Sequence, residues 1–168
     1  LNYDATEKIG AGYGMVKYTY QKWEFIAGVR VEHTNQGYIL KFPTDNVDPE
    51  GNQKYTDVLP SFHAKYGVHK NANLRFSYAR SINRPSFFEI VPYSIINEDY
   101  KEKGNPDLKH TVADNLDLRY EFFPKSSEQF MVGLFYKNLK NPIENGLLNE
   151  GQDTYYIPMN FGNAANLG

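Results

Sequence analysis

Apolar and polar side chains alternate with a period of two residues along most of this chain. From Trp23 to Glu32, one set of alternate positions holds Trp, Phe, Ala, Val and Val, and the other holds Glu, Ile, Gly, Arg and Glu. This period predicts β-strands with one apolar and one polar face. The clearest alternation covers residues 23–32, 61–68, 74–79, 115–122 and 130–137.

Two further strands are expected from weaker patterns. A stretch rich in glycine and tyrosine, residues 9–20, alternates less strictly, and a seventh strand is expected to begin near Tyr155. Helical periodicity is poor throughout the chain. We therefore expect no substantial helix, only a short helical turn within residues 94–103.

The connections between these strands are alternately short and long. Transmembrane barrels have this arrangement, because their periplasmic turns are short and their extracellular loops are longer. Each predicted strand has about ten residues, close to the ~9–11 that a tilted strand needs to cross hydrocarbon. The pattern predicts an all-β fold, an antiparallel up-and-down meander of about six to seven transmembrane-type strands. The expected short turns are residues 21–22, 69–72 and 124–128, and the expected long connections are 34–54, 83–107 and 138–154.

Closure of the sheet limits what such a meander can be. About eight strands are the minimum for a closed bacterial membrane barrel. An open sheet cannot lie in lipid, because the N–H and C=O groups at its edges would have no hydrogen-bond partners. We therefore expect residues 1–168 to form a single partial β-barrel domain, a fragment of a larger outer-membrane barrel.

Composition narrows the possibilities further. The chain has 18 basic and 20 acidic residues, and the basic residues are scattered, so we expect no nucleic-acid partner. Its 14 tyrosines and 11 phenylalanines suit strands and the aromatic girdles of membrane barrels. The mean hydropathy of −0.63 does not exclude a membrane barrel, because only every second strand residue meets lipid.

Three stretches of the chain carry a resemblance to a known family. They are residues 55–61 (YTDVLPS), residues 74–85 (LRFSYARSINRP) and residues 104–109 (GNPDLK), and residues 27–34 (AGVRVEHT) add to them. In this order and spacing they resemble the C-terminal half of the barrel of TonB-dependent outer-membrane receptors, most of all those of Bacteroidetes. His110 departs from the family pattern, in which a proline commonly follows the lysine.

The resemblance implies a location in the bacterial outer membrane and a role in nutrient uptake by a Gram-negative bacterium. It implies a barrel of ~22 strands with a plugged lumen. The implied partners are the remainder of the barrel, the plug domain, outer-membrane lipid and, through the plug, the TonB complex. The plug lies outside this chain, so the fragment is not expected to transport by itself. The resemblance does not select the cargo, which could be an iron–siderophore complex, cobalamin, a glycan or a peptide.

No catalytic or cofactor chemistry is expected. His33, His63, His69 and His110 lack the spacing of a metal site, and the chain has no cysteine, so we predict no metal, no cofactor and no enzyme activity. The charged residues of the polar faces are expected to line a wet barrel interior and contact the plug. These residues are Glu24, Arg30, Glu32, Lys65, Arg75, Asp117, Arg119 and Glu121.

Aromatic residues in the long connections are the candidate ligand-binding residues. Aromatics on loops can form a ligand-capturing surface. They can equally pack the loops together or anchor the protein at the membrane interface. The candidates are Tyr38, Phe42, Phe87, Phe88, Tyr93 and Tyr100.

One alternative from another class stays open at this point. A soluble lipocalin-like β-barrel or β-sandwich that binds a small ligand would suit the chain length. It would place the apolar faces inside and the charged faces outside, so the direction of the two faces separates the two hypotheses. A small outer-membrane barrel enzyme would need a clustered nucleophile or acid–base set, and we identify none.

Overall fold

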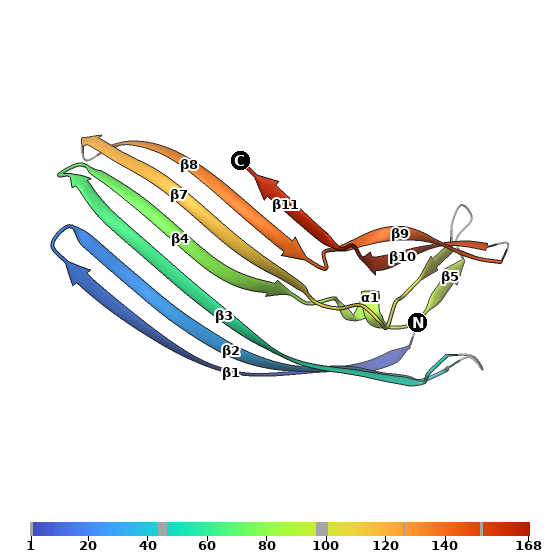
Figure 1. The fold of residues 1–168 in the computed structure, drawn as a ribbon. Coiled ribbons are helices and arrows are strands. Elements are labelled where there is room, and N and C mark those ends of the chain that lie inside the picture. The colour runs from blue at the N-terminus through green and yellow to red at the C-terminus, as the bar shows by residue number, and fades with distance from the viewer. Residues whose placement is uncertain (1, 44–46, 97–100, 126, 152) are drawn as a thin grey trace.

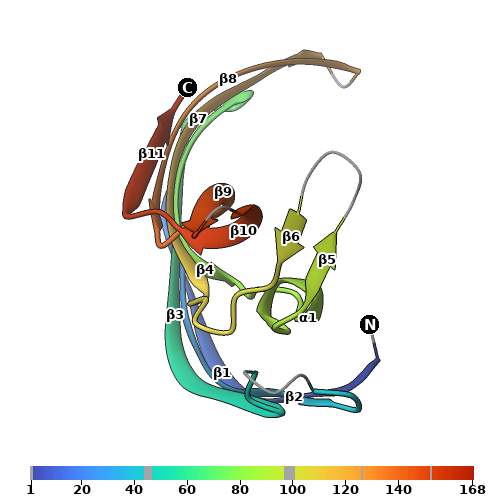
Figure 2. The same ribbon diagram turned by 90° about the vertical axis from the view of Figure 1, so that its right-hand side faces the viewer.

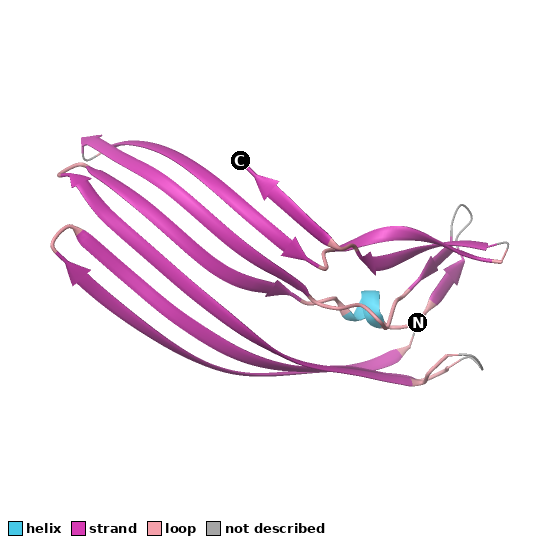
Figure 3. Ribbon diagram, viewed as in Figure 1, coloured by secondary structure: helices cyan, strands magenta, loops and turns pink. Residues whose placement is uncertain are grey.

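The computed structural model describes residues 2–43, 47–96, 101–125, 127–151 and 153–168. Long strands dominate it, and they run side by side at a common tilt (Figures 1 and 3). Seven of them form one antiparallel sheet in the order β1-β2-β3-β4-β7-β8-β11. Their bounds are Tyr3–Tyr20 (β1), Trp23–Leu40 (β2), Glu50–His69 (β3), Ala72–Asn83 (β4), Thr111–Lys125 (β7), Glu128–Lys140 (β8) and Asn163–Leu167 (β11).

The register of this sheet keeps the apolar positions of neighbouring strands on one face. Directly opposed residues in a sheet have their side chains on the same face. One row across five strands is Phe25, Ala64, Phe76, Leu118 and Leu134. The adjacent row, on the other face, is Glu24, Lys65, Arg75, Arg119 and Gly133. The predicted partition into an apolar and a charged face therefore holds across the sheet.

The sheet curves into an open arc, and the charged face is the concave one. Figure 2 shows α1 (Phe87–Ile90), β5 (Ser94–Ile96) and β6 (Lys101–Lys103) on the concave side. A small apolar core of Tyr38, Ile90, Val91 and Leu108 joins these elements to β2. Tyr38 shares its face with Glu24 and Arg30, because all three lie at even positions of the same strand.

Two strands extend much further than their apolar pattern. Residues 34–54 do not form one long loop, because β2 continues to Leu40 and β3 begins at Glu50, with an unbroken ladder from Glu32↔Asp57 to Ile39↔Glu50. From Glu32 to Gly37 both faces of β2 carry polar side chains or glycine, so the alternation that marks a strand disappears while the backbone pairing continues. Tyr38 consequently lies on a strand.

Pro60 occupies a position in β3 where a proline is tolerated. Proline lacks the backbone N–H that a central strand needs on both sides. β3 pairs with β4 only from Ser61 onward, so Pro60 is the first residue beyond that pairing and has a ladder partner only in β2.

A second sheet forms at the long-loop end of the barrel wall. Its order is β5-β6-β10-β9, in which β9 is Ile143–Glu150 and β10 is Asp153–Asn160. β6 and β10 run parallel. This sheet was not predicted, because its strands are short and its central pair joins residues far apart in sequence, such as Lys101 with Tyr155.

One expectation is wrong within this region. The seventh wall strand is β11 and begins at Asn163, whereas Tyr155 belongs to β10. The helical turn predicted within residues 94–103 partly lies outside the described residues, because 97–100 are not described, and the described part of the chain has a helix at α1. α1 begins at Phe87 because Ser86 and Glu89 form a capping box, with the Ser86 backbone N–H donating to Glu89 Oε2 at 2.6 Å. The structure contains, in its described part, no helix that is long and apolar enough to cross a membrane.

Candidate functional site

A buried ion-pair cluster holds the start of the 84–110 segment against the concave wall. Glu32, only 6% exposed, accepts hydrogen bonds from Arg30 at 2.6 and 2.8 Å and forms an ion pair with Arg84. Arg84 Nε also donates to Thr34 Oγ1 at 3.2 Å. Buried charges need such partners, because desolvation costs them several kcal/mol otherwise. Glu32 thus holds the chain against the wall at the point where it leaves the sheet after β4.

The Gly104-Asn105-Pro106 turn ties three elements together. The Asn105 backbone N–H donates to the carbonyl of Glu89 in α1 at 2.7 Å, and its side chain donates to the carbonyl of Pro158 in β10 at 2.9 Å. Gln53 of β3 donates to the Pro106 carbonyl at 2.7 Å. The turn is therefore structural, and it positions the second sheet on the wall.

Gly104 is required in this turn because a side chain there would overlap the Val91 carbonyl oxygen. We expect Gly104→Ala to lower the free energy of unfolding by about 1–3 kcal/mol, the usual range for overpacking. Gly162→Ala is the matched control, since no atom lies within 4 Å of its Cβ position. Denaturant unfolding of both variants in the full-length protein checks this. Equal stability of the two variants would show that Val91 and Gly104 do not pack as described.

His110 forms a second attachment to the wall. Its ring lies 2.9 Å from Asp57 Oδ1 (Nε2 to oxygen) and stacks on Tyr55 with 4.1 Å between ring centroids. Among the described residues no group of three or more His, Asp or Glu side chains is placed to hold a metal ion. His110 is accordingly a structural contact in the position where the resemblance leads us to expect proline.

A hollow of about 660 Å³ lies between the wall and the second sheet, at the long-loop end. Its size falls in the range of ~300–1,000 Å³ typical of small-molecule sites. Its lining is mixed: Tyr38, Ile90 and Met159 are apolar contributors, while Gln36 and Asp107 are polar ones. A ligand there would meet both aliphatic surface and hydrogen-bonding groups.

A smaller neighbouring hollow of about 270 Å³ contains two of the predicted aromatic residues, Phe88 and Tyr93. Their ring centroids lie 4.7 Å apart. Tyr93 is 7% exposed, and burial, together with the nearby carboxylates of Glu102 and Glu89, raises its pKa to about 12. Phe88 is 49% exposed and is the one of this pair that is open to a ligand.

The remaining predicted aromatics are dispersed. Tyr38 lines the 660 Å³ hollow and is 5% exposed, and Phe87 packs against the small core. Phe42 is 80% exposed and lines neither hollow. Tyr100 lies outside the described residues. The structure therefore brings Phe88 and Tyr93 together, and ligand contact by any of the six stays a prediction.

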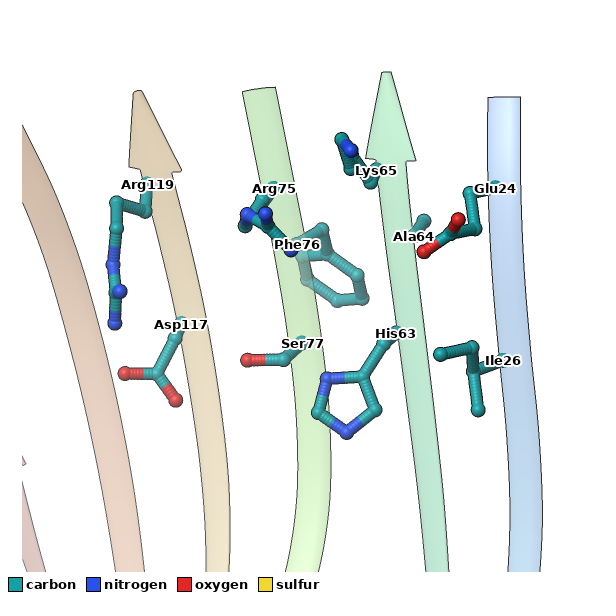
Figure 4. A pocket seen from close by; sticks show the side chains of 10 residues that line it. All are labelled: Glu24, Ile26, His63, Ala64, Lys65, Arg75, Phe76, Ser77, Asp117 and Arg119. Carbon is teal, nitrogen blue, oxygen red and sulfur yellow. The ribbon is translucent and has the colours of Figure 1, made fainter. Parts of the chain in front are cut away.

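The other end of the concave wall carries a charged hollow of about 370 Å³ (Figure 4). Lys65, Arg75 and Arg119 stand in one row across three strands, an unfavourable arrangement of like charges. Glu121 offsets Arg75 with a hydrogen bond of 2.8 Å. At the end of the row, Glu24 pairs with Lys17 at 2.9 Å. These residues face the lumen, as expected from their parity.

Sequence reasoning missed several residues that build the site. Gln36, Gln53 and Asn105 were missed because they lie in stretches predicted as loops. In a loop there is no period-two pattern to show which way a side chain points. Asn160 was also missed, although it accepts from the Lys109 backbone N–H at 2.7 Å and donates to the Lys109 and Asn141 carbonyls, each at 2.9 Å. Gln36 and Gln53 lie on the wall strands β2 and β3, and Asn105 and Asn160 are brought to the wall by the long-range contacts of the second sheet and of the turn before β7.

The convex face of the sheet carries large, exposed apolar side chains. Trp23, Val29, Phe76, Leu118 and Leu134 on this face are between 39% and 62% exposed. So much apolar surface on the outside of a curved sheet, opposite a charged concave face, suits a wall with lipid outside and water inside. The fold is a section of a transmembrane β-barrel wall.

The chain belongs to the outer membrane protein beta-barrel family, which it matches over residues 1–168. The protein is accordingly an outer-membrane protein. No curated protein matches the sequence. The family and the outward apolar face both disfavour the soluble lipocalin-like alternative.

Solved structures share the fold at low sequence identity. The ferric enterobactin receptor PfeA of Pseudomonas aeruginosa, a variant in complex with enterobactin, is 15% identical with a TM-score of 0.62, covering 98% of this chain and 33% of that one. The siderophore receptor PirA of Pseudomonas aeruginosa is 14% identical with a TM-score of 0.60, covering 96% and 38%. The copper transporter OprC is 16% identical with a TM-score of 0.72, covering 98% and 25%. The chain therefore spans about a third of the length of these structures.

Proposed function

We propose that this chain is part of the barrel of a TonB-dependent receptor that imports a scarce nutrient across the outer membrane. The observation that carries the proposal is the packing of residues 84–96 and 101–110 on the concave wall, which is held by the Glu32, Asn105 and His110 contacts. An inward-folded segment with a hollow at the long-loop end suits ligand capture in a barrel lumen. The motifs of residues 74–85 and 104–109 and the fold shared with PfeA and PirA support it.

The proposal assigns a role to each end of the concave wall. The long-loop end, with its two hollows, would bind the nutrient, and Phe88 is the exposed aromatic we expect to contact it. The charged hollow at the short-turn end would contact the plug domain, whose movement would open the path. We propose no catalytic step for this chain, because the solved structures that share its fold include the receptors PfeA and PirA.

Energised uptake tests the proposal. Deletion of the gene is expected to abolish cellular uptake of one labelled nutrient among a ferric siderophore, cobalamin, an oligosaccharide and a peptide. Collapse of the proton-motive force should abolish the same uptake in the parent strain, because the TonB complex draws on that force. Uptake that requires the gene but continues without the proton-motive force would contradict the proposal and indicate a passive pore.

A further inference from the structure

The long-loop end of the protein carries an excess of negative charge. The described parts of residues 41–49, 84–110 and 141–162 hold five basic and seven acidic residues, whereas the rest of the chain holds thirteen basic and ten acidic residues. Charge of one sign around a cleft attracts ligands of the opposite sign and repels those of the same sign. The excess is thus placed where a ligand would arrive.

The lining of the 660 Å³ hollow has the same sign. Asp48, Glu50, Asp107 and Glu150 contribute carboxylates, and Lys103 is the one basic side chain that lines it among the described residues. Lys103 is already paired with Glu150 at 2.7 and 2.9 Å. The other three carboxylates have no ion-pair partner in the described part of the chain, so the hollow offers unpaired negative charge only.

An unsatisfied acceptor provides an independent observation. Gln36 lines the hollow, is 2% exposed, and donates its side-chain N–H to the Pro85 carbonyl at 3.0 Å. Its Oε1 is buried and has no hydrogen-bond partner. A buried oxygen without a donor is unfavourable, and a ligand that carries N–H or O–H groups would relieve it after a small side-chain adjustment. Among the described residues that line this hollow, the one buried side-chain polar atom without a hydrogen-bond partner is therefore an acceptor.

The carboxylates are also arranged for an extended ligand. No three acidic or histidine side chains in the described ranges come together as a metal site. The aliphatic side chains of Ile157 and Met159 line the same space. An amine- or guanidinium-bearing organic molecule matches this combination of separated carboxylates and apolar surface, whereas a single metal ion does not.

We propose that the 660 Å³ hollow is a subsite for a cationic, hydrogen-bond-donating organic group, so that the cargo is a basic peptide or another polyamine-like molecule. This inference rests on the proposed receptor function and narrows its cargo. It separates this protein from receptors of polyanionic ferric complexes, because a polyanion would meet three unpaired carboxylates here.

Binding of two capped peptides of equal length to the full-length receptor in detergent tests the inference. One peptide carries two lysines and the other two glutamates. At low salt we expect the basic peptide to bind at least about tenfold more tightly, and Asp48→Asn with Asp107→Asn to reduce its affinity about tenfold. Both aspartates are exposed, so the double variant is expected to fold.

The matched control removes two charges at the same end but outside this hollow. Asp4→Asn with Glu144→Gln should leave the affinity of the basic peptide within about twofold. Equal losses in both double variants would overturn the subsite and leave only a general field effect. Tighter binding of the acidic peptide would overturn it outright.

The uptake experiment distinguishes failure of this inference from failure of the proposed function. Energised uptake of an anionic cargo would leave the receptor function standing and overturn the cationic subsite. Selective binding of the basic peptide without any energised uptake would support the subsite and contradict the receptor function.

Discussion

Replacing Leu134 with arginine is expected to lower the free energy of unfolding by about 2–4 kcal/mol, the cost of an arginine on the lipid face near the bilayer midplane. Leu134 is 62% exposed on the convex face and stands in a row with Leu118 and Phe76. In the membrane this row would contact acyl chains, where a guanidinium loses its hydration.

The adjacent residue supplies the control. Phe135 is also a large apolar residue, is 42% exposed, and points to the concave face opposite Asp117. Phe135→Arg places the same charge in water beside a carboxylate, so its cost should stay within about 1 kcal/mol. Reversible denaturant unfolding of the full-length receptor from liposomes measures both. A larger loss for Phe135→Arg than for Leu134→Arg would reverse our assignment of the two faces.

Removing the charge of Glu32 is the second large effect we expect. Glu32→Gln leaves Arg84 and Arg30 without their shared carboxylate. Breaking a fully buried pair costs about 3–5 kcal/mol, and we expect about 2–3 kcal/mol here because water screens the more exposed arginine. The side chains of Arg84 and Arg30 are 21% and 45% exposed, which motivates that reduction.

Glu24→Gln is the matched variant for Glu32→Gln. Glu24 lies on the same strand and face, but its ion pair with Lys17 is solvent-exposed, with side-chain exposures of 31% and 56%. Solvent screens such a pair, so we expect Glu24→Gln to unfold close to the parent protein. Denaturant unfolding gives the two stabilities, and limited proteolysis of residues 84–110 shows whether that segment detaches. If Glu32→Gln unfolds like the parent protein, the cluster does not anchor the segment.

The parts of the fold that were predictable from sequence are those in which one face of a strand is uniform. Where Phe62, Phe76 and Leu118 alternate with polar or charged residues, the period of two predicts both the strand and which of its faces meets lipid. Lipid and water impose opposite requirements on adjacent residues. The short turns, the up-and-down order and the need for a larger barrel followed from the same pattern.

The site was less predictable for a physical reason. Around Gln36 the side chains on both faces of β2 are polar, so hydropathy carries no periodic signal and the sequence predicts a loop, although Gln36 and Tyr38 are buried in the fold. Tyr38 and Tyr93 were chosen as aromatic candidates, but whether an aromatic on a connection packs inward or stays open depends on which segments cover it. Tyr38 and Tyr93 are buried and Phe88 is half exposed. The residues next to each aromatic in the sequence do not show this difference, because it depends on which distant segments cover the side chain.

The sequence by itself determined the class of the protein: its alternating faces, its alternately short and long connections and its family motifs define a piece of an outer-membrane barrel. Only the tertiary structure decided where the 84–110 segment goes. Its position depends on contacts between residues 50 or more apart, such as Arg84 with Thr34 and Asn105 with Pro158. Long-range hydrogen bonds of this kind leave no local periodicity, so the hollow they enclose, and its negative charge, appear only when the chain is folded.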